Sequence, residues 1–224
     1  ALLCNTSGGF NVAVGRAALY SNTTACSNTA VGACSLYANT SAGGNTAVGN
    51  NALQQNTCGH YNTAVGLNAL KENSCCGRNT AVGAYALTAN TTGCRNTALG
   101  YSSLGTLTSG KVNTATGYWS MAALTTGCNN TASGYKAMEC STTAKYSAAF
   151  GDRALRCNTT GCCNSAFGFY SLYNNTTANS NTAVGLCALA TNTTGGSSVA
   201  VGVNAGLCNT TASLVAVGVN ALCC

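Results

Sequence analysis

The chain has very little charge, and the residues that usually carry catalysis are scarce. Only 5% of its 224 residues are charged, the acids are limited to Glu72, Glu139 and Asp152, and His60 is the single histidine. General acid–base catalysis needs carboxylates or imidazoles placed together, and these three acids fall in distant parts of the chain. We therefore expect no enzyme, no catalytic residue and no cofactor.

Clustered positive charge and long apolar runs are also missing. The nine Lys and Arg residues give a net charge of +6 but never form a run, whereas nucleic-acid binding depends on clustered cations. No stretch approaches the ~20 apolar residues that span a bilayer. The beginning carries no signal-peptide pattern, which suggests a mature form or a fragment of something longer. We expect no nucleic-acid partner and no membrane span.

Cysteine, by contrast, is abundant, with 16 residues. Metal sites need Cys or His clustered at short spacings. The close pairs here are directly adjacent cysteines, which are poor chelators, so we expect no metal site. Disulfides formed in an oxidising environment are the better interpretation, and they predict an extracellular, virion-surface or cell-surface location.

The chain is built from a 17-residue repeat. Glycine recurs at positions 15, 32, 49, 66, 83, 100, 117, 134, 151, 168, 185 and 202, and the next copy, Gly218, follows after 16 residues. The average unit reads N-T-A-V-G-x-x-A-L-x-x-N-T-T-G-x-x. We number its positions as columns 1 to 17, with this glycine in column 5. Column 3 is Ala in all thirteen copies, and column 9 is almost always Leu or Met.

This unit is too short for a helical repeat of about 34 residues. It predicts an all-β fold: a parallel β-solenoid of about 13 coils, with 17 residues and two short strands per coil, as a single domain over residues 1–224. Stacked coils would place like residues ~4.8 Å apart, so that columns 3 and 9 fill the core and Asn side chains bond from coil to coil. Alternation would turn column 4, usually Val, outward, where it would form an apolar face for packing against another rod.

The amino-acid sequence of the repeat resembles that of known fibre proteins. Units such as NTAVGLNALKENSCCGR (62–78) and NTAVGLCALATNTTGGS (181–197) are similar to the 17-residue repeats of bacteriophage tail-fibre proteins and of surface fibres of large viruses. The N-T-A-V-G stretch is more loosely similar to the head repeats of trimeric autotransporter adhesins. The resemblance implies an exposed shaft or an adhesive fibre.

The cysteine columns predict disulfides between neighbouring coils. Cys58 and Cys75 share column 14, Cys140 and Cys157 share column 11, and Cys76 and Cys94 are diagonal neighbours. Both chain ends fall in columns 8 to 11 without a polar cap, which favours head-to-tail stacking and a disulfide between subunits. The candidates at the two ends are Cys4 and Cys224 between subunits, with Cys208 pairing either Cys224 or Cys223.

Two outward features predict binding or modification. Sequons without proline give N-glycosylation candidates, although asparagine would also be expected there for turn geometry and ladder bonding. The candidate asparagines are Asn5, Asn22, Asn39, Asn90, Asn158, Asn175, Asn192 and Asn209. An aromatic strip of Tyr101, Tyr118, Tyr135 and Trp119 would hold sugars or stack across coils.

These patterns together predict a structural subunit of an extracellular filament. The partner would be the protein itself, as a head-to-tail homopolymer with lateral bundling. The alternative is an adhesive or receptor-binding shaft that contacts glycans or a cell surface. Ice binding by the threonines of columns 13 and 14 is a third hypothesis. The adjacency of these threonines argues against it, because neighbouring strand residues face opposite sides.

Overall fold

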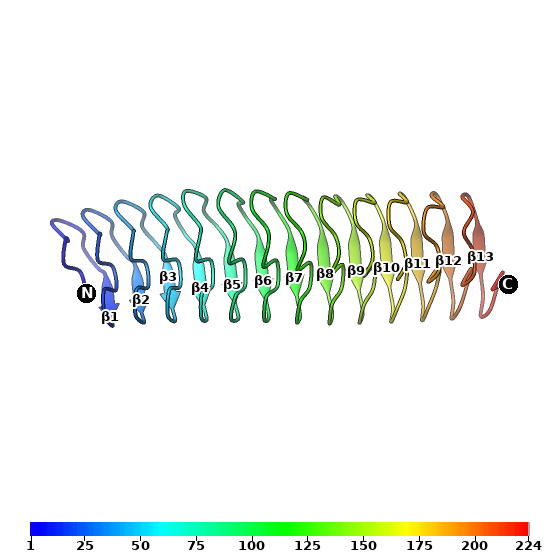
Figure 1. The fold of residues 1–224 in the computed structure, drawn as a ribbon, viewed down its shortest axis with the longest axis horizontal. Helices are drawn as coiled ribbons and strands as arrows, with labels where there is room; N and C mark the ends of the chain where they lie inside the picture. The colour runs from blue at the N-terminus through cyan, green and yellow to red at the C-terminus, as the bar shows by residue number, and fades with distance from the viewer. Residues whose placement is uncertain (224) are drawn as a thin grey trace. The chain divides into compact units, whose positions relative to one another are not determined.

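The computed structural model describes residues 1–223 and contains thirteen short strands, one in each coil (Figure 1). By contacts the chain divides into two compact units, Ala1–Val112 and Asn113–Cys224. The first unit holds β1 (Val12–Val14), β2 (Thr29–Val31), β3 (Thr46–Val48), β4 (Thr63–Val65), β5 (Thr80–Val82) and β6 (Thr97–Leu99). The second holds β7 (Thr114–Thr116), β8 (Thr131–Ser133), β9 (Ala148–Phe150), β10 (Ser165–Phe167), β11 (Thr182–Val184), β12 (Val199–Val201) and β13 (Val215–Val217).

Within each unit the strands are parallel and paired in register. In β3 and β4, for example, Ala47 is opposite Ala64 and Val48 is opposite Val65. The offset is 17 residues, which is the period of the sequence. The skipped residue near the C-terminus is absorbed in a turn, since Ala200 still pairs with Ala216. The fold is a β-solenoid, as the repeat predicted.

The second strand that the sequence predicted for each coil is absent from the described residues. Three columns of each coil have left-handed backbone instead, as at Asn51 (φ 56°), Leu53 (φ 51°) and Tyr61 (φ 60°) of the third coil. These angles lie outside the β region, so columns 7, 9 and 17 interrupt any second strand. Column 5 has its own requirement: a Cβ on Gly49 would lie 2.5 Å from the carbonyl oxygen of Gly66 in the next coil.

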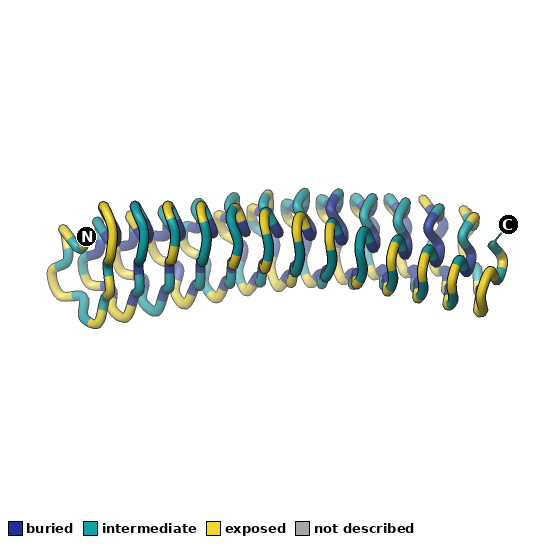
Figure 2. Tube along the Cα trace, turned by 90° about the horizontal axis from the view of Figure 1, so that it is seen from below, coloured by how far each residue is buried: buried dark blue, intermediate teal, exposed yellow. Residues whose placement is uncertain are grey.

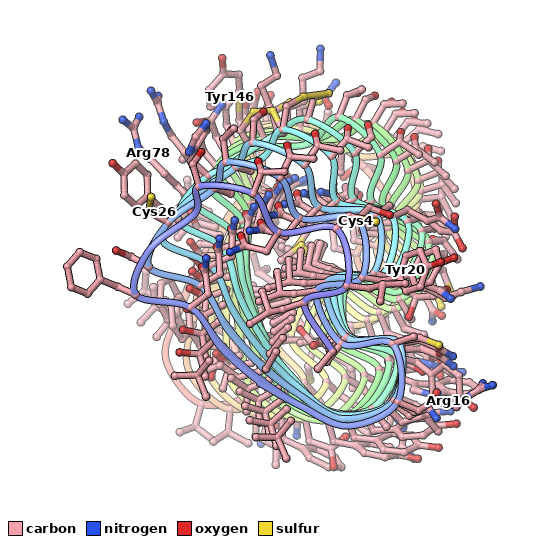
Figure 3. The ribbon with its side chains drawn as sticks, turned by 90° about the vertical axis from the view of Figure 1, so that its left-hand side faces the viewer. Cys4, Arg16, Tyr20, Cys26, Arg78 and Tyr146 are labelled. Carbon is pink, nitrogen blue, oxygen red and sulfur yellow. A yellow bond between two sulfur atoms is a disulfide. The ribbon has the colours of Figure 1, made fainter. Side chains whose placement is uncertain are left out.

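Small and aliphatic side chains fill the interior of each coil. Ala47, Ala52 and Leu53, in columns 3, 8 and 9, are fully buried, and Figure 2 shows buried segments at the same places in successive coils. The prediction that columns 3 and 9 point inward is confirmed. In the first unit, Arg16 and Arg78 project outward on opposite sides of the coils (Figure 3).

Two buried asparagine ladders tie the coils together. In column 12, Asn56 Nδ2 donates to Asn39 Oδ1 of the preceding coil at 3.1 Å and to the carbonyl of Gly59 at 2.9 Å. In column 1, the backbone N–H of Asn62 donates to Asn45 Oδ1 at 2.9 Å. The side chain of Asn62 donates in turn to the carbonyl of Cys76, in column 15 of the same coil, at 3.1 Å. Because these two ladders run between neighbouring coils, burial of the amides without loss of hydrogen bonds requires coils in register.

The column 12 ladder is interrupted where asparagine is replaced by Leu107, Leu124 and Ser141. Buried polar atoms lose their partners at these places. Asn90 Oδ1, which precedes the first leucine, and Ser141 Oγ have no hydrogen-bond partner within the described chain. The ladder therefore depends on an unbroken column, and the exceptions are its weak points.

Candidate assembly and binding surfaces

The outer face of the parallel strands carries a stripe of apolar side chains from column 4. In the first unit the stripe contains Val48, which is 36% exposed, and Leu99. In the second unit Phe150 and Phe167 stack with ring centroids 5.1 Å apart. The predicted outward placement of column 4 is confirmed. Since each residue lies directly above its column neighbour, the face is regular enough to pack against a similar face.

Two disulfides join neighbouring coils of the first unit. Cys58 is bonded to Cys75 with a Cα–Cα distance of 4.5 Å, and Cys76 to Cys94 with a Cα–Cα distance of 5.3 Å. Both pairs were candidates from the column positions. Stacking explains them, because it brings residues 17 or 18 positions apart within bonding reach.

The other predicted cysteine pairs are not bonded among the described residues. Cys140 and Cys157 keep free, half-buried thiols although their coils are stacked, and burial raises the pKa of each. Cys208 also carries a free thiol, so no bond joins it to Cys223. Cys4 is exposed and free, while its predicted partner Cys224 lies outside the described residues.

The candidate glycosylation sites are largely inside the molecule. The acceptor asparagines at positions 22, 39, 90, 158, 175 and 192 are fully buried. Their amide nitrogens donate within the coil or to the preceding coil, as Asn175 Nδ2 does to Asn158 Oδ1 at 2.8 Å. A glycan on these atoms would open the ladder, so these six have the alternative role in turn geometry and ladder bonding. Asn5 and Asn209 are partly exposed and remain candidates.

Three members of the predicted aromatic strip meet in the second unit. Tyr118 stacks on Trp119 with centroids 5.5 Å apart and on Tyr135 at 5.6 Å. Lys136 Nζ lies 4.9 Å from the centre of the Trp119 ring. Tyr101 belongs to the first unit, where it meets Tyr85 edge to face. The strip offers flat ring faces beside a cation.

An ionic ladder beside this strip was not predicted. The carboxylate of Glu139, which is 11% exposed, accepts from Lys136 Nζ at 3.2 Å and from Arg156 Nε at 2.6 Å. Arg156 Nη1 also donates to the hydroxyl of Tyr173 at 2.6 Å, and these bonds raise the pKa of Arg156. The sequence carries the signal for this ladder, because Glu139 and Arg156 lie 17 residues apart in column 10 and Lys136 lies in column 7 of the same coil as Glu139. A comparison of the charges in these two columns would have found it.

A basic groove of about 550 Å³ lies in the first unit and was also missed. Its cations form no run in the sequence, because they are about 17 residues apart along the chain. The groove is lined by Cys58, His60, Tyr61, Cys75, Gly77, Arg78, Cys94, Arg95, Lys111 and Val112. Stacking brings three cations, two aromatic rings and both disulfides to one place.

The remaining expectations concern metals, membranes and relatives. Within residues 1–223, no three His, Cys, Asp or Glu side chains gather as a metal site would require. That part of the chain also has no helix with the length and hydropathy of a membrane span. No family model, curated protein or solved structure matches the chain. The resemblance to viral fibre repeats stays a prediction.

Proposed function

We propose that this β-solenoid is a structural subunit of an extracellular filament in which copies stack head to tail. The observation that carries the proposal is the repetition of one stacking contact from coil to coil. In the third coil, the backbone N–H of Thr46 donates to the carbonyl of Asn62 at 2.9 Å, and that of Leu53 to the carbonyl of Ala69 at 3.0 Å. A coil that can bind the next coil by these bonds can bind an equivalent coil of another copy, and such a contact does not close on itself.

Two further features support an exposed filament. Each contact between two stacked copies would bury the unpaired strand edge at the end of each copy, and such edges otherwise pair with other chains. The disulfides of the first unit fit an oxidising compartment and stabilise coils against local opening. The apolar column 4 face would supply lateral bundling between filaments.

Electron microscopy of the purified protein tests the proposal directly. Val215 occupies column 2 of the last coil, so its N–H is the donor that a following copy would use. Val215→Pro removes this donor, whereas Val215→Thr keeps it and restores the common residue of the column. We expect long fibres from the wild type and Val215→Thr, and mostly short particles from Val215→Pro with an unchanged circular dichroism spectrum. Particles of single-subunit size at all concentrations of wild-type protein would refute head-to-tail assembly.

The second candidate function is an adhesive or receptor-binding shaft. The stacked rings of Tyr118, Trp119 and Tyr135 favour it, since exposed aromatic faces bind sugars by apolar contact. A glycan array with wild type and Trp119→Ala checks this, and equal signals from the two proteins would remove the strip as the binding site.

Ice binding has weaker support. The column 13 hydroxyls are engaged within the stack, as Thr23 Oγ1 donates to the carbonyl of Thr40 at 3.1 Å. Their donor protons therefore already have a partner in the protein. Absence of thermal hysteresis in the soluble protein would exclude this function.

A further inference from the structure

Three cations from three successive coils line the basic groove of the first unit. Arg78 and Arg95 occupy column 17 of neighbouring coils, and Lys111 occupies column 16 of the next coil. Coils in a parallel stack are about 4.8 Å apart, so the three side chains span a distance on the order of 10 Å. All three are exposed. One ligand of this length can therefore reach all three exposed side chains.

The two arginines of the groove have few carboxylates near them. Residues 1–112 contain five Lys or Arg and a single acid, Glu72. Glu72 is already held by Lys71, whose Nζ lies 3.0 Å from Oε1. The guanidinium groups of Arg78 and Arg95 have no acidic partner within the described residues of this unit. The two guanidinium groups therefore give the groove a positive surface.

The fold does not require arginine at these positions. Column 17 is a left-handed turn position, with φ of 62° at Arg78 and 58° at Arg95. The same position is occupied by Gly44 and Ser27 in earlier coils, and glycine is the residue best suited to such angles. A long charged side chain there adds nothing to the turn. Its charge is thus available for a purpose other than folding.

Aromatic rings and disulfides give this groove rigid walls. Tyr61 lies close over Gly44, where an added Cβ would come within 2.7 Å of its ring, and remains 66% exposed. His60 is held by its Nδ1, which accepts from the N–H of Gly43 at 3.0 Å. The Cys58–Cys75 disulfide and Cys94 complete the lining. Pre-organised walls reduce the entropy lost when a ligand binds.

We propose that this groove binds an acidic saccharide, with its sulfate or carboxylate groups on Arg78, Arg95 and Lys111 and its apolar ring face on Tyr61. Guanidinium groups form strong paired hydrogen bonds with such anions, and an aromatic face suits the C–H side of a sugar ring. Single-stranded nucleic acid is the less favoured occupant. Proteins hold it by stacking successive bases on a series of aromatic side chains along a basic groove, whereas the aromatic rings of this lining are those of the adjacent His60 and Tyr61. The proposal goes beyond filament formation and does not depend on it.

Isothermal titration with defined ligands tests this site. The ligands are a sulfated disaccharide, the same disaccharide without sulfate, inorganic sulfate, and a hexathymidylate oligonucleotide. Arg78→Gln with Arg95→Gln removes two groove charges. The matched control, Arg16→Gln with Lys71→Gln, removes two charges from the same unit outside the groove lining; Arg16 lies on the opposite side of the coil from Arg78 (Figure 3). Circular dichroism confirms that each variant is folded.

We expect the sulfated disaccharide to bind the wild type and the control alike. Its Kd should rise about tenfold or more in the groove variant, since each lost charge-assisted contact weakens binding substantially. The unsulfated disaccharide should bind at least tenfold more weakly than the sulfated one. Tyr61→Ala should weaken saccharide binding while leaving inorganic sulfate unaffected.

Four results would overturn the proposal. The first is no binding of the sulfated disaccharide by the wild type, and the second is an equal loss in the control and groove variants. The third is tighter binding of the oligonucleotide than of the saccharide, which would assign the groove to nucleic acid. The fourth is saccharide binding that is insensitive to Tyr61→Ala and no tighter than inorganic sulfate, which would indicate a simple anion site. Because each titration reports on this groove, failure here leaves filament assembly to its own microscopy test.

Discussion

The buried asparagine ladder allows a quantitative test at Asn56. Its side chain makes three hydrogen bonds: it donates to Asn39 Oδ1 at 3.1 Å and to the Gly59 carbonyl at 2.9 Å, and it accepts from Asn73 Nδ2 at 2.8 Å. Asn56→Ala leaves two buried acceptors, Asn39 Oδ1 and the Gly59 oxygen, without these donors. Asn73 Nδ2 keeps a second acceptor, the Cys76 carbonyl at 2.9 Å. The substitution therefore leaves two buried acceptors, and no buried donor, without a hydrogen bond.

An unsatisfied buried polar group costs about 1–3 kcal/mol, so the two acceptors left by Asn56→Ala should lower the free energy of unfolding by about 2–6 kcal/mol. Asn50→Ala is the control, because Asn50 lies in the same coil but is exposed, and its effect should stay within about 0.5 kcal/mol. Asn56→Leu separates the loss of hydrogen bonds from the loss of side-chain volume, since leucine fits the same column at Leu107 and Leu124. It should still destabilise, because it restores no donor.

The assay is urea unfolding followed by circular dichroism, with the slope of each transition compared between variants. A repeat stack can unfold in parts, so an unchanged slope is needed before the free energies are compared. A loss below about 0.5 kcal/mol for Asn56→Ala, or full stability in Asn56→Leu, would refute the claim that the amide hydrogen bonds hold the coils in register.

Three further predictions follow from the same stack. Ser141→Asn should raise the free energy of unfolding by about 1 kcal/mol, because a new amide oxygen can accept from Asn158 Nδ2; a lower urea midpoint would contradict this. Reducing the two disulfides, which close loops of 17 and 18 residues, should destabilise the first unit by about 3 kcal/mol for each bond, measured as the urea midpoint with and without phosphine reductant; identical midpoints would be the contrary result. Burial raises the pKa of Cys140 and Cys157, so iodoacetamide should label them more slowly than the exposed Cys26 at pH 8, as read by peptide mass spectrometry. The folded state holds these two thiol protons more tightly, so their contribution to stability should fall as pH rises through the unfolded thiol pKa of about 8.5; faster labelling than Cys26, or stability rising over that range, would argue against buried thiols.

The sequence predicted the core and the register well. Ala recurs in column 3 of every coil and Leu or Met in column 9 of almost every coil. Because coils stack by translation, residues 17 apart must be neighbours. The same reasoning placed Val48 outward and brought Cys58 to Cys75. It could not choose among cysteine pairs of similar spacing. Cys140 and Cys157 share a column in the same way, yet their thiols remain free.

The prediction of a second strand failed for a physical reason. Leu53 and Tyr61 have little intrinsic preference for left-handed backbone, so their identities gave no local signal for it. Stacking overrides this preference. Once Leu53 is buried and its N–H is bonded to Ala69, the conformation is held by the coil below and above it.

The period and the composition of its columns, both readable from the sequence, determined that this chain stacks in equal coils and which residues line the core. Only the tertiary structure decided the direction in which each turn residue points. That direction depends on left-handed turns stabilised by neighbouring coils rather than by local preference. It is the reason why Arg78, Arg95 and Lys111, far apart along the chain, line one groove beside Tyr61.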